Sequence, residues 1–563
     1  MTSDFKLGWR RRPWPLLVLV AGLGCLNRLT LLAQNVKSPT EPHLRQGITY
    51  LDQRNFPKAI DEFRLAVQLN PENATAHDYL GVALAQLNQT AEGAEEFLKA
   101  TQLADGLASA HFHLAMAYDS LGRVVDAITQ YEATLLIEPD SVDARYALSA
   151  ACWKLGDRDG AIQALRQIIR QNPPFVAEVF YNLGVELRQE GQLEEAVREL
   201  KTAVRLQPES AGYYLALGEA LTERQELNAA IESIKKAVDL SPGTPEYHYN
   251  LGEAFRLKTD FEAAKSEFQS ALRLDARYPH GRRQLGLVLR QQGDYQGAVE
   301  NLQAAVEEDT NDAEAHYYLG SVYLKLNDLE HAVDNLSDSV RLNPYDSAAH
   351  VALAGALRRS GRAQEAEKEL KEAQQLDDLK ANAGRSRVLL GSAVEHMKRG
   401  QNEAALDELL QAAQLSPEYA EVQLQLAHAL ERTRAPTAVV VSALRKVIAL
   451  NPNHAQAHLQ LGLTLKKMGH STEAVEEIRR SVELAPSLIE GHRELGEDAL
   501  EAHNWTTAVA EFGTVLVWDS TDRLARQGIS LAQAGRRKQA HLGSAPTAAR
   551  KPSLTAGGLR GVH

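Results

Sequence analysis

The sequence contains few of the residues that build cross-links or metal centres. Only two cysteines, Cys25 and Cys152, occur in 563 residues, so neither a disulfide framework nor a four-cysteine zinc site is available. Cys152 falls on an apolar helical position, and we expect it to be buried. Aromatic residues make up only 6% of the chain. Prolines and glycines are spaced at intervals and not clustered, which is typical of punctuation between helices.

The motifs of common enzyme classes are also missing. The sequence has no glycine-rich phosphate loop, no H-E-x-x-H and no G-x-S-x-G. Paired carboxylates such as Glu194–Glu195 and Glu476–Glu477 are expected at the starts of helices, where they favour the helix dipole. We therefore predict no catalytic residue, no cofactor and no metal ligand.

Acidic and basic residues are distributed unevenly along the chain. Residues 523–563 hold eight basic and no acidic residues, and residues 1–39 hold six basic residues and one acid. Residues 40–522 then carry 47 basic and 73 acidic residues, a balance of −26. Such a body repels phosphate backbones, so we predict no nucleic-acid partner. Residues 543–563 are predicted to be a disordered basic tail, with contact to an acidic partner or a membrane as the alternative.

No apolar run is long enough to span a bilayer comfortably. Arg10, Arg11 and Arg12 precede an apolar stretch from Leu16 to Leu26, which Asn27 and Arg28 interrupt. Eleven apolar residues fall short of the roughly 20 that a spanning helix needs, and the order of charge and apolar residues is typical of a secretory signal.

Residues 1–33 are therefore predicted to be a signal peptide or an N-terminal membrane anchor, with 34–39 as a linker. We expect export to the periplasm or cell envelope, with possible membrane attachment through residues 13–33. The alternatives are a lipoprotein box at residues 22–25 and a hydrophobic leader on a cytosolic protein.

A repeat of 34 residues runs through most of the chain. Its clearest mark is a Leu-Gly pair, and a small residue, usually alanine, follows twelve positions after each glycine. Proline closes many of the units, as at Pro71, Pro208 and Pro344. The Leu-Gly pairs that share this phase are Leu80-Gly81, Leu183-Gly184, Leu217-Gly218, Leu251-Gly252, Leu285-Gly286, Leu319-Gly320, Leu461-Gly462 and Leu495-Gly496.

Each unit has the physical pattern of two packed helices. Apolar residues recur at helical spacing, and a turn such as "EGQ" at 190–192 or "QGD" at 292–294 interrupts them. Glycine in the turn can take the left-handed conformation that ends a helix. Small residues let two helices approach closely, and proline stops the second helix. One pair cannot bury its apolar face alone, so stacked pairs are predicted to share an elongated core.

This pattern closely resembles the tetratricopeptide repeat. The resemblance covers about residues 40–522, or fourteen units, and implies an all-α, right-handed superhelical solenoid of stacked antiparallel helix pairs. Repeats 1–10 are placed at 40–380 and repeats 11–14 at 381–522, followed by a capping helix or partial repeat at 523–542. Repeat 11 has lost its Leu-Gly pair, which weakens the register near 380–440.

Eight of the eighteen histidines fall on one position of the repeat. Equivalent positions in adjacent repeats lie on helices about 8–10 Å apart, whereas zinc needs its ligand nitrogens at about 2.0–2.1 Å around one point. The histidines are therefore predicted to be packing or rim residues and not a metal site. They are His43, His77, His111, His248, His316, His350, His458 and His492.

The resemblance also implies a concave groove lined by the first helix of each unit. Asparagines in relatives can hold a peptide backbone there. A row of arginines is interpreted as a site for partner carboxylates, and the alternative is pairing with neighbouring acids such as Glu219 and Glu253. The predicted partner-binding residues are Tyr146, Trp153, Tyr181, Asn182, Arg188, Tyr249, Asn250, Arg256, Arg283, Arg290, Tyr317 and Arg358.

Together these features predict a non-enzymatic scaffold that binds segments of other proteins or peptides in this groove, outside the cytoplasm. One alternative is a targeting subunit that docks an enzyme such as a glycosyltransferase or a secretion component. The other is a structural spacer without a groove ligand. The sequence does not name the partner.

Overall fold

The computed structural model describes residues 39–171 and 176–543. The signal or anchor predicted at 1–33 lies outside these ranges, as do nearly all of the linker predicted at 34–39 and nearly all of the tail predicted at 543–563. The described residues form helices joined by turns, with no strand. None of their helices combines the length and apolar character that crossing a bilayer requires.

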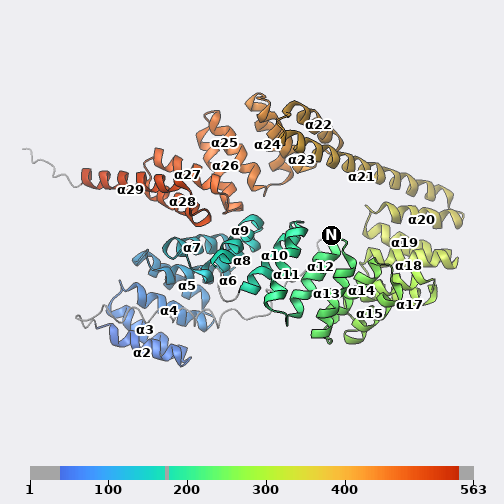
Figure 1. The fold of residues 1–563 in the computed structure, drawn as a ribbon, viewed down its shortest axis with the longest axis horizontal. Helices are drawn as coiled ribbons and strands as arrows, with labels where there is room; N and C mark the ends of the chain where they lie inside the picture. Colours follow the sequence, from blue (N-terminus) through green and yellow to red (C-terminus); the bar gives the residue numbers. More distant parts are fainter. Residues whose placement is uncertain (1–38, 172–175, 544–563) are drawn as a thin grey trace, which may run out of the picture. The chain divides into compact units, whose positions relative to one another are not determined.

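The helices alternate along the chain as first and second members of packed pairs (Figure 1). The first helices are α2 (Glu41–Asp52), α4 (Ala74–Gln86), α6 (Ala108–Ser120), α8 (Val142–Leu155), α10 (Val176–Gln189), α12 (Ala211–Glu223), α14 (Pro245–Leu257), α16 (Gly281–Gln292), α18 (Ala313–Leu326), α20 (Ser347–Arg359), α23 (Ala420–Arg432), α25 (Ala455–Lys467) and α27 (Ile489–Glu501). The second helices are α3 (Phe56–Leu69), α5 (Thr90–Leu103), α7 (Val124–Ile137), α9 (Arg158–Gln171), α11 (Leu193–Leu206), α13 (Leu227–Leu240), α15 (Phe261–Leu274), α17 (Tyr295–Glu308), α19 (Leu329–Leu342), α22 (Asn402–Leu415), α24 (Thr437–Leu450), α26 (Ser471–Leu484) and α28 (Trp505–Trp518).

The Leu-Gly pair marks the closest approach within each helix pair. A Cβ added at Gly218 on α12 would lie 2.3 Å from Cγ1 of Ile234 on α13 and 3.3 Å from the Ala230 carbonyl oxygen. Ile234 and Ala230 are both buried. Glycine therefore makes room for the large apolar residue of the second helix, and the small residue lets the two backbones approach.

The turn glycines have the predicted left-handed conformation. Gly191 has φ +72° and Gly293 has φ +82°, and Asn88 and Asn327 fill the same conformation in other units with φ +62° and +63°. Each of these residues lies just beyond the end of a first helix. The turn reverses the chain and sets the antiparallel direction of the second helix.

At several steps of the stack the first helices of successive pairs contact one another, as α10 does with α12 and α12 with α14. Among residues 39–171 and 176–543, second helices of successive pairs make no comparable contacts. The stack within the larger unit is therefore tighter along the first helices. We call the surface that these helices form the first-helix face.

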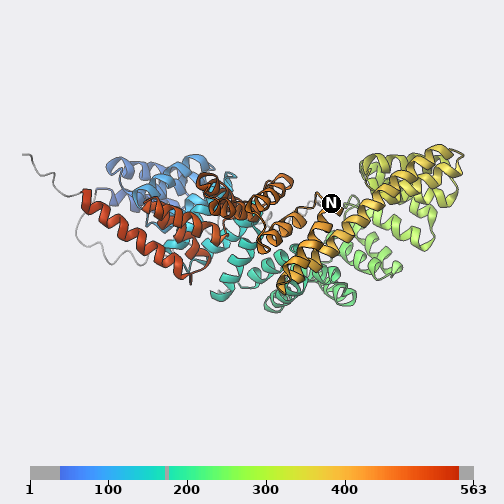
Figure 2. The same cartoon turned by 90° about the horizontal axis from the view of Figure 1, so that it is seen from above.

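One junction differs from the rest. Helix α21 (Ala363–Lys398) runs for 36 residues without a turn, and serves both as the second helix of the pair begun by α20 and as the first helix of the pair completed by α22. Figure 2 shows it as one uninterrupted helix. In its middle, Leu379 and Val388 are 65% and 74% exposed. The apolar core is divided at this helix, because one cluster ends near Ala366 and the next begins near Ala393.

The described chain divides into two compact units, one ending at Pro486 and the other starting at Ser487. This division does not fall at the 380/381 boundary used in the sequence-based repeat count. In the second unit, α29 (Arg523–Gly543) packs on α28 and α27 as a single helix. Ala525 and Ala532 of α29 are buried against this pair, while Leu524 and Leu531 remain more than half exposed.

Candidate binding face

All twelve residues predicted for partner binding lie on first helices. Tyr146 and Asn182 are buried, Arg358 is exposed, and the others are half-buried. Helix α8 carries Tyr146 and Trp153; α10 carries Tyr181, Asn182 and Arg188; α14 carries Tyr249, Asn250 and Arg256; α16 carries Arg283 and Arg290; α18 carries Tyr317 and α20 carries Arg358.

The two predicted asparagines are engaged inside the protein. Asn182 Nδ2 donates to the Tyr146 hydroxyl oxygen at 2.6 Å, and that hydroxyl donates to Glu178 Oε1 at 3.2 Å. Asn250 Nδ2 donates to the carbonyl oxygen of Glu246, one turn earlier in the same helix, at 2.9 Å. Both amides would have to release these acceptors before they could hold a partner backbone.

Two arginines of the predicted row, Arg188 and Arg256, are paired with acids. Arg188 pairs with Glu219 and lies 3.5 Å from Glu223. Arg256 forms a two-pronged contact with Glu253, whose shorter arm is 2.8 Å. This pairing with Glu219 and Glu253 is the arrangement that the sequence left open as the alternative to partner binding.

The remaining arginines of the row have other surroundings. Arg290 Nη1 donates to the Ser321 hydroxyl at 3.1 Å, and the guanidinium lies 5.2 Å from the centre of the Tyr318 ring. Arg358 is exposed and contacts no acid within the described part of the chain. Arg358 is thus the one member of the row that remains available to a carboxylate without breaking an existing contact.

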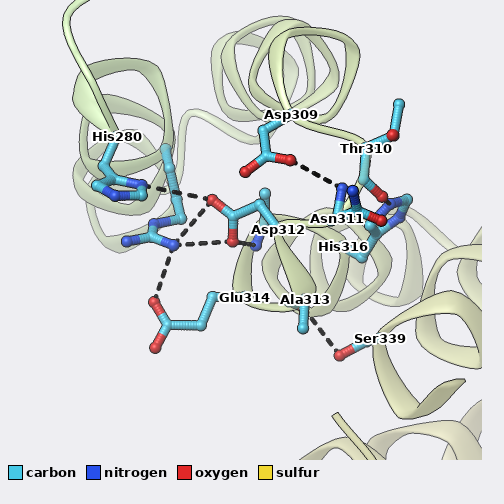
Figure 3. Close-up of polar contacts among 11 residues, drawn as sticks. His280, Asp309, Thr310, Asn311, Asp312, Ala313, Glu314, His316 and Ser339 are labelled. Atoms are coloured by element: carbon cyan, nitrogen blue, oxygen red, sulfur yellow. Dashed lines mark hydrogen bonds and ion pairs between the residues drawn. The ribbon is translucent and has the colours of Figure 1, made fainter. Parts of the chain in front are cut away.

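A cluster of polar side chains surrounds Asp312, at the start of α18 (Figure 3). Asp312 accepts a 2.9 Å hydrogen bond from the Ala315 backbone N–H and two 2.8 Å bonds from Arg283, and His280 Nδ1 lies 3.7 Å away. Arg283 also reaches Glu314 at 3.1 Å. Burial opposes ionisation of Asp312, but these donors outweigh it and lower the pKa of its carboxyl to about 2.

Two other carboxyls, those of Glu186 and Glu219, have pKa values raised above the ordinary value. Burial raises the pKa of Glu186 on α10 to about 7, although Arg158 lies 3.2 Å away. Burial also raises the pKa of Glu219, outweighing its ion pair with Arg188, and the nearby charge of Glu246 adds to the rise. In both cases desolvation exceeds the attraction of a single arginine.

The repeated histidines form a second polar system, behind the first-helix face. In six repeats the Nδ1 atom lies 2.5–2.7 Å from a glutamate nineteen residues later, on the second helix of the same pair. The pairs are His43–Glu62, His77–Glu96, His248–Glu267, His350–Glu369, His458–Glu477 and His492–Glu511. In the other two repeats, His111 meets Gln130 at 2.8 Å and His316 meets Asn335 at 3.2 Å.

The other ring nitrogen reaches back to the preceding turn. Nε2 of His77 lies 3.0 Å from the Pro71 carbonyl oxygen, and Nε2 of His350 lies 3.1 Å from that of Pro344. The two ring nitrogens therefore contact two different elements, the glutamate of the second helix and the backbone of the preceding turn. In six repeats, those of His77, His111, His248, His316, His350 and His458, the histidine thus connects the inter-repeat turn with both helices of its pair. We call this arrangement the histidine clamp.

The histidine clamp shows which contacts the repeated histidines, predicted to be packing or rim residues, make. It also corrects the assignment of Glu477. Glu477 lies inside α26 and accepts from His458, so it does not serve the start of that helix as expected. The spacing of nineteen residues between histidine and glutamate is visible in the sequence and would have predicted the pairs. Within residues 39–171 and 176–543, histidines, cysteines and acids form no group able to hold a metal ion. The Cys152 thiol is buried, as predicted, and burial raises its pKa.

Comparison with family models identifies the repeat. Models described as "Tetratricopeptide repeat" or "TPR repeat" together match well over half of the chain. The matched residues are 44–108, 120–180, 181–245, 224–282, 286–327, 322–381 and 443–476. A search of curated proteins gave no match.

Solved structures with similar folds include a tetratricopeptide repeat protein from Parabacteroides merdae, at 17% identity and TM-score 0.37 over 42% of this chain and 93% of that one. YrrB, described as a TPR protein with an unusual peptide-binding site, has 24% identity and TM-score 0.28 over 31% and 91% of the two chains. PilW, described as a type IV pilus biogenesis factor, has 17% identity and TM-score 0.34 over 36% and 94%.

The family matches agree with the all-helical stack, its helix pairs and its turn glycines. The repeats support a role in binding other proteins. The chain therefore belongs to the tetratricopeptide repeat family, whose stacked helix pairs are in general non-catalytic scaffolds for protein interaction.

Proposed function

We propose that this protein is a non-enzymatic scaffold that binds an extended segment or helix of a partner protein along the first-helix face, outside the cytoplasm. The observation that carries the proposal is the face itself between α8 and α20. It presents a continuous series of half-buried tyrosines and arginines, such as Tyr181, Tyr249, Arg290 and Tyr317. Rigid aromatic rings and arginines are the residues that most often anchor protein interfaces.

The proposed location rests on the sequence of the first 33 residues, where three arginines precede an eleven-residue apolar stretch. A fusion of residues 1–39 to a periplasmic reporter enzyme tests it. Reporter activity outside the cytoplasm is expected, and retention of activity inside would refute the location without affecting the binding proposal. A fusion that lacks residues 10–26 serves as the control.

Site-specific photo-cross-linking tests the binding face. A photoreactive amino acid replaces Tyr317 on α18 in one variant and Lys236, exposed on the second helix α13, in the matched variant. After irradiation in the native compartment, we expect a discrete adduct from position 317 and none from position 236. The captured protein is then purified and its binding to the full chain measured directly. Equal cross-linking from both positions would contradict a groove-bound partner.

A further inference from the structure

The unmatched charge on the first-helix face is negative in repeats 5 to 8. Arg188 and Arg256 are each engaged with acids, as described above. Glu246, in the first turn of α14, is half-buried, and no side chain or backbone donor among the described residues contacts its carboxylate. Burial accordingly raises the pKa of the Glu246 carboxyl. A carboxylate in this state gains from any cation that reaches it.

Tyrosine rings stand next to this carboxylate. Tyr181 and Tyr213 stack with ring centres 4.8 Å apart, and Tyr249 and Tyr278 meet with ring centres 5.2 Å apart. Glu246 and Tyr249 are three residues apart on α14 and therefore lie on the same side of that helix. After burial and the charge of Glu219, the charge of Glu246 also contributes to raising the pKa of Tyr181 to about 12. It likewise contributes, after burial, to raising the pKa of Tyr278.

Tyr278 lies in the turn before α16 because the repeat is irregular at this point. The 34-residue period aligns it with Thr244 and Asp312, the residues that precede α14 and α18. Helix α16 instead starts only at Gly281, and His280 before it has φ +59°, an uncommon conformation for a residue other than glycine. The displaced start leaves Tyr278 in the turn against Tyr249. A local departure from a regular pattern is often found at a binding site.

We propose that Glu246, Tyr249 and Tyr278 form a site for a lysine or arginine side chain of the partner segment. The carboxylate supplies the charge, and the ring faces supply cation–π contact. The inference rests on the proposed function and narrows its partner to a basic segment. It differs from the expectation for the arginine row, because Arg188 and Arg256 already have acids, while no cation among the described residues contacts Glu246. The −26 balance of residues 40–522 attracts the same class of partner over longer range.

Two matched peptides test the cation site. One is a fluorescein-labelled peptide of alternating alanine and lysine, and the other carries glutamate in place of lysine. Binding to the full chain is measured by fluorescence anisotropy at physiological salt. We expect the lysine peptide to bind. Glu246→Gln should weaken it by about tenfold, which is the size of loss expected for a partly desolvated charge pair. The control Glu232→Gln removes one acid from the exposed side of α13 and should change affinity less than about twofold.

A ring test separates cation–π contact from simple attraction. Tyr278→Phe keeps the ring and should retain the affinity of the intact chain, whereas Tyr278→Leu should lose several-fold. Equal losses for Glu246→Gln and Glu232→Gln would overturn the site, since binding would then follow net charge alone. Preferential binding of the glutamate peptide, or of neither peptide, would also overturn it. The scaffold proposal would survive these results if cross-linking from position 317 still succeeds.

Discussion

Two carboxylates on the same face, near the starts of α18 and α14, have opposite surroundings. Asp312 receives hydrogen bonds from Ala315 and Arg283, and its pKa falls to about 2. Glu246 receives none from the described residues, and burial raises its pKa. The negative charge of Asp312 is balanced by donors within the protein, so this carboxylate stabilises the fold. The charge of Glu246 is not balanced in this way, so an external cation can bind to it. Substitution of Asp312 should therefore reduce the stability of the protein, whereas substitution of Glu246 should not.

The largest expected effect is at Asp312. Asp312→Ala removes the cap of α18 and leaves Arg283 without its main partner, so the free energy of local unfolding should fall by about 3 kcal/mol at neutral pH. Hydrogen exchange of α16 to α18 measures this loss. The control is Asp346→Ala, which removes only the cap contact to Ala348 N–H and should cost about 1 kcal/mol.

The Asp312 contribution should also depend on pH. Because its folded pKa of about 2 lies below the ordinary value of about 3.9, the stabilisation is present above that value. It should be lost as the pH falls from about 4 towards 2. A difference between the intact chain and Asp312→Ala that stays constant down to pH 2 would show that the ion pairs contribute nothing.

Glu186 should behave in the reverse way. Its folded pKa of about 7 exceeds the ordinary value of about 4.3, so the folded state binds more protons and stability should decline as the pH rises between these values. Glu186→Gln should stabilise α8 to α10 by about 2 kcal/mol at pH 8 and have little effect at pH 5. Hydrogen exchange at both pH values measures it, and a loss of stability at pH 8 would show that the Arg158 pair outweighs desolvation.

The histidine clamp should show a coupling of intermediate size. A double-mutant cycle on His350→Ala and Glu369→Ala should give about 1 kcal/mol, because the hydrogen bond is largely buried and its acceptor is a carboxylate. The matched cycle on His316 and Asn335 has the same geometry without the charge and should give less. Hydrogen exchange of each helix pair supplies the four free energies. Equal couplings would mean that the carboxylate adds nothing to the clamp.

The smallest effect is expected at Glu246. Glu246→Gln should leave local stability of α14 within about 0.5 kcal/mol or raise it slightly, because no internal donor is lost and one half-buried charge is removed. Hydrogen exchange of α12 to α16 checks this. A loss comparable to that of Asp312→Ala would place Glu246 among the residues of the fold and would end the contrast between the two carboxylates.

The fold could be predicted from the sequence because residues within each repeat determine how its two helices pack. The glycine and alanine positions fix the helix approach, and turn residues such as Gly191 have the expected conformation. The junction at α21 could not be placed in the same way. Repeat 11 lacks the Leu-Gly pair, and no proline stops the helix between residues 363 and 398. Local pattern there favours neither a turn nor a boundary.

For the first-helix face, the sequence predicted where the residues lie but not which contacts they make. The period places Arg188 and Arg256 on the face, but it does not show that Glu219 and Glu253 will meet them. The Arg188 partner comes from the next repeat, 31 residues away. The role of Tyr278 was also missed, because it depends on the displaced start of α16 and not on the repeat pattern. The glutamate nineteen residues after six of the eight histidines was visible in the sequence and was not used.

Helix α21 has a consequence for how the chain loses its structure. In a stack where each pair is held by its nearest neighbours, disorder that starts at one end spreads by dissolving one interface after another. At α21 the usual interface is replaced by exposed helix around Leu379 and Val388. We expect the spread to halt there, so that the helices before and after it melt as separate cooperative blocks, even though one unbroken helix belongs to both.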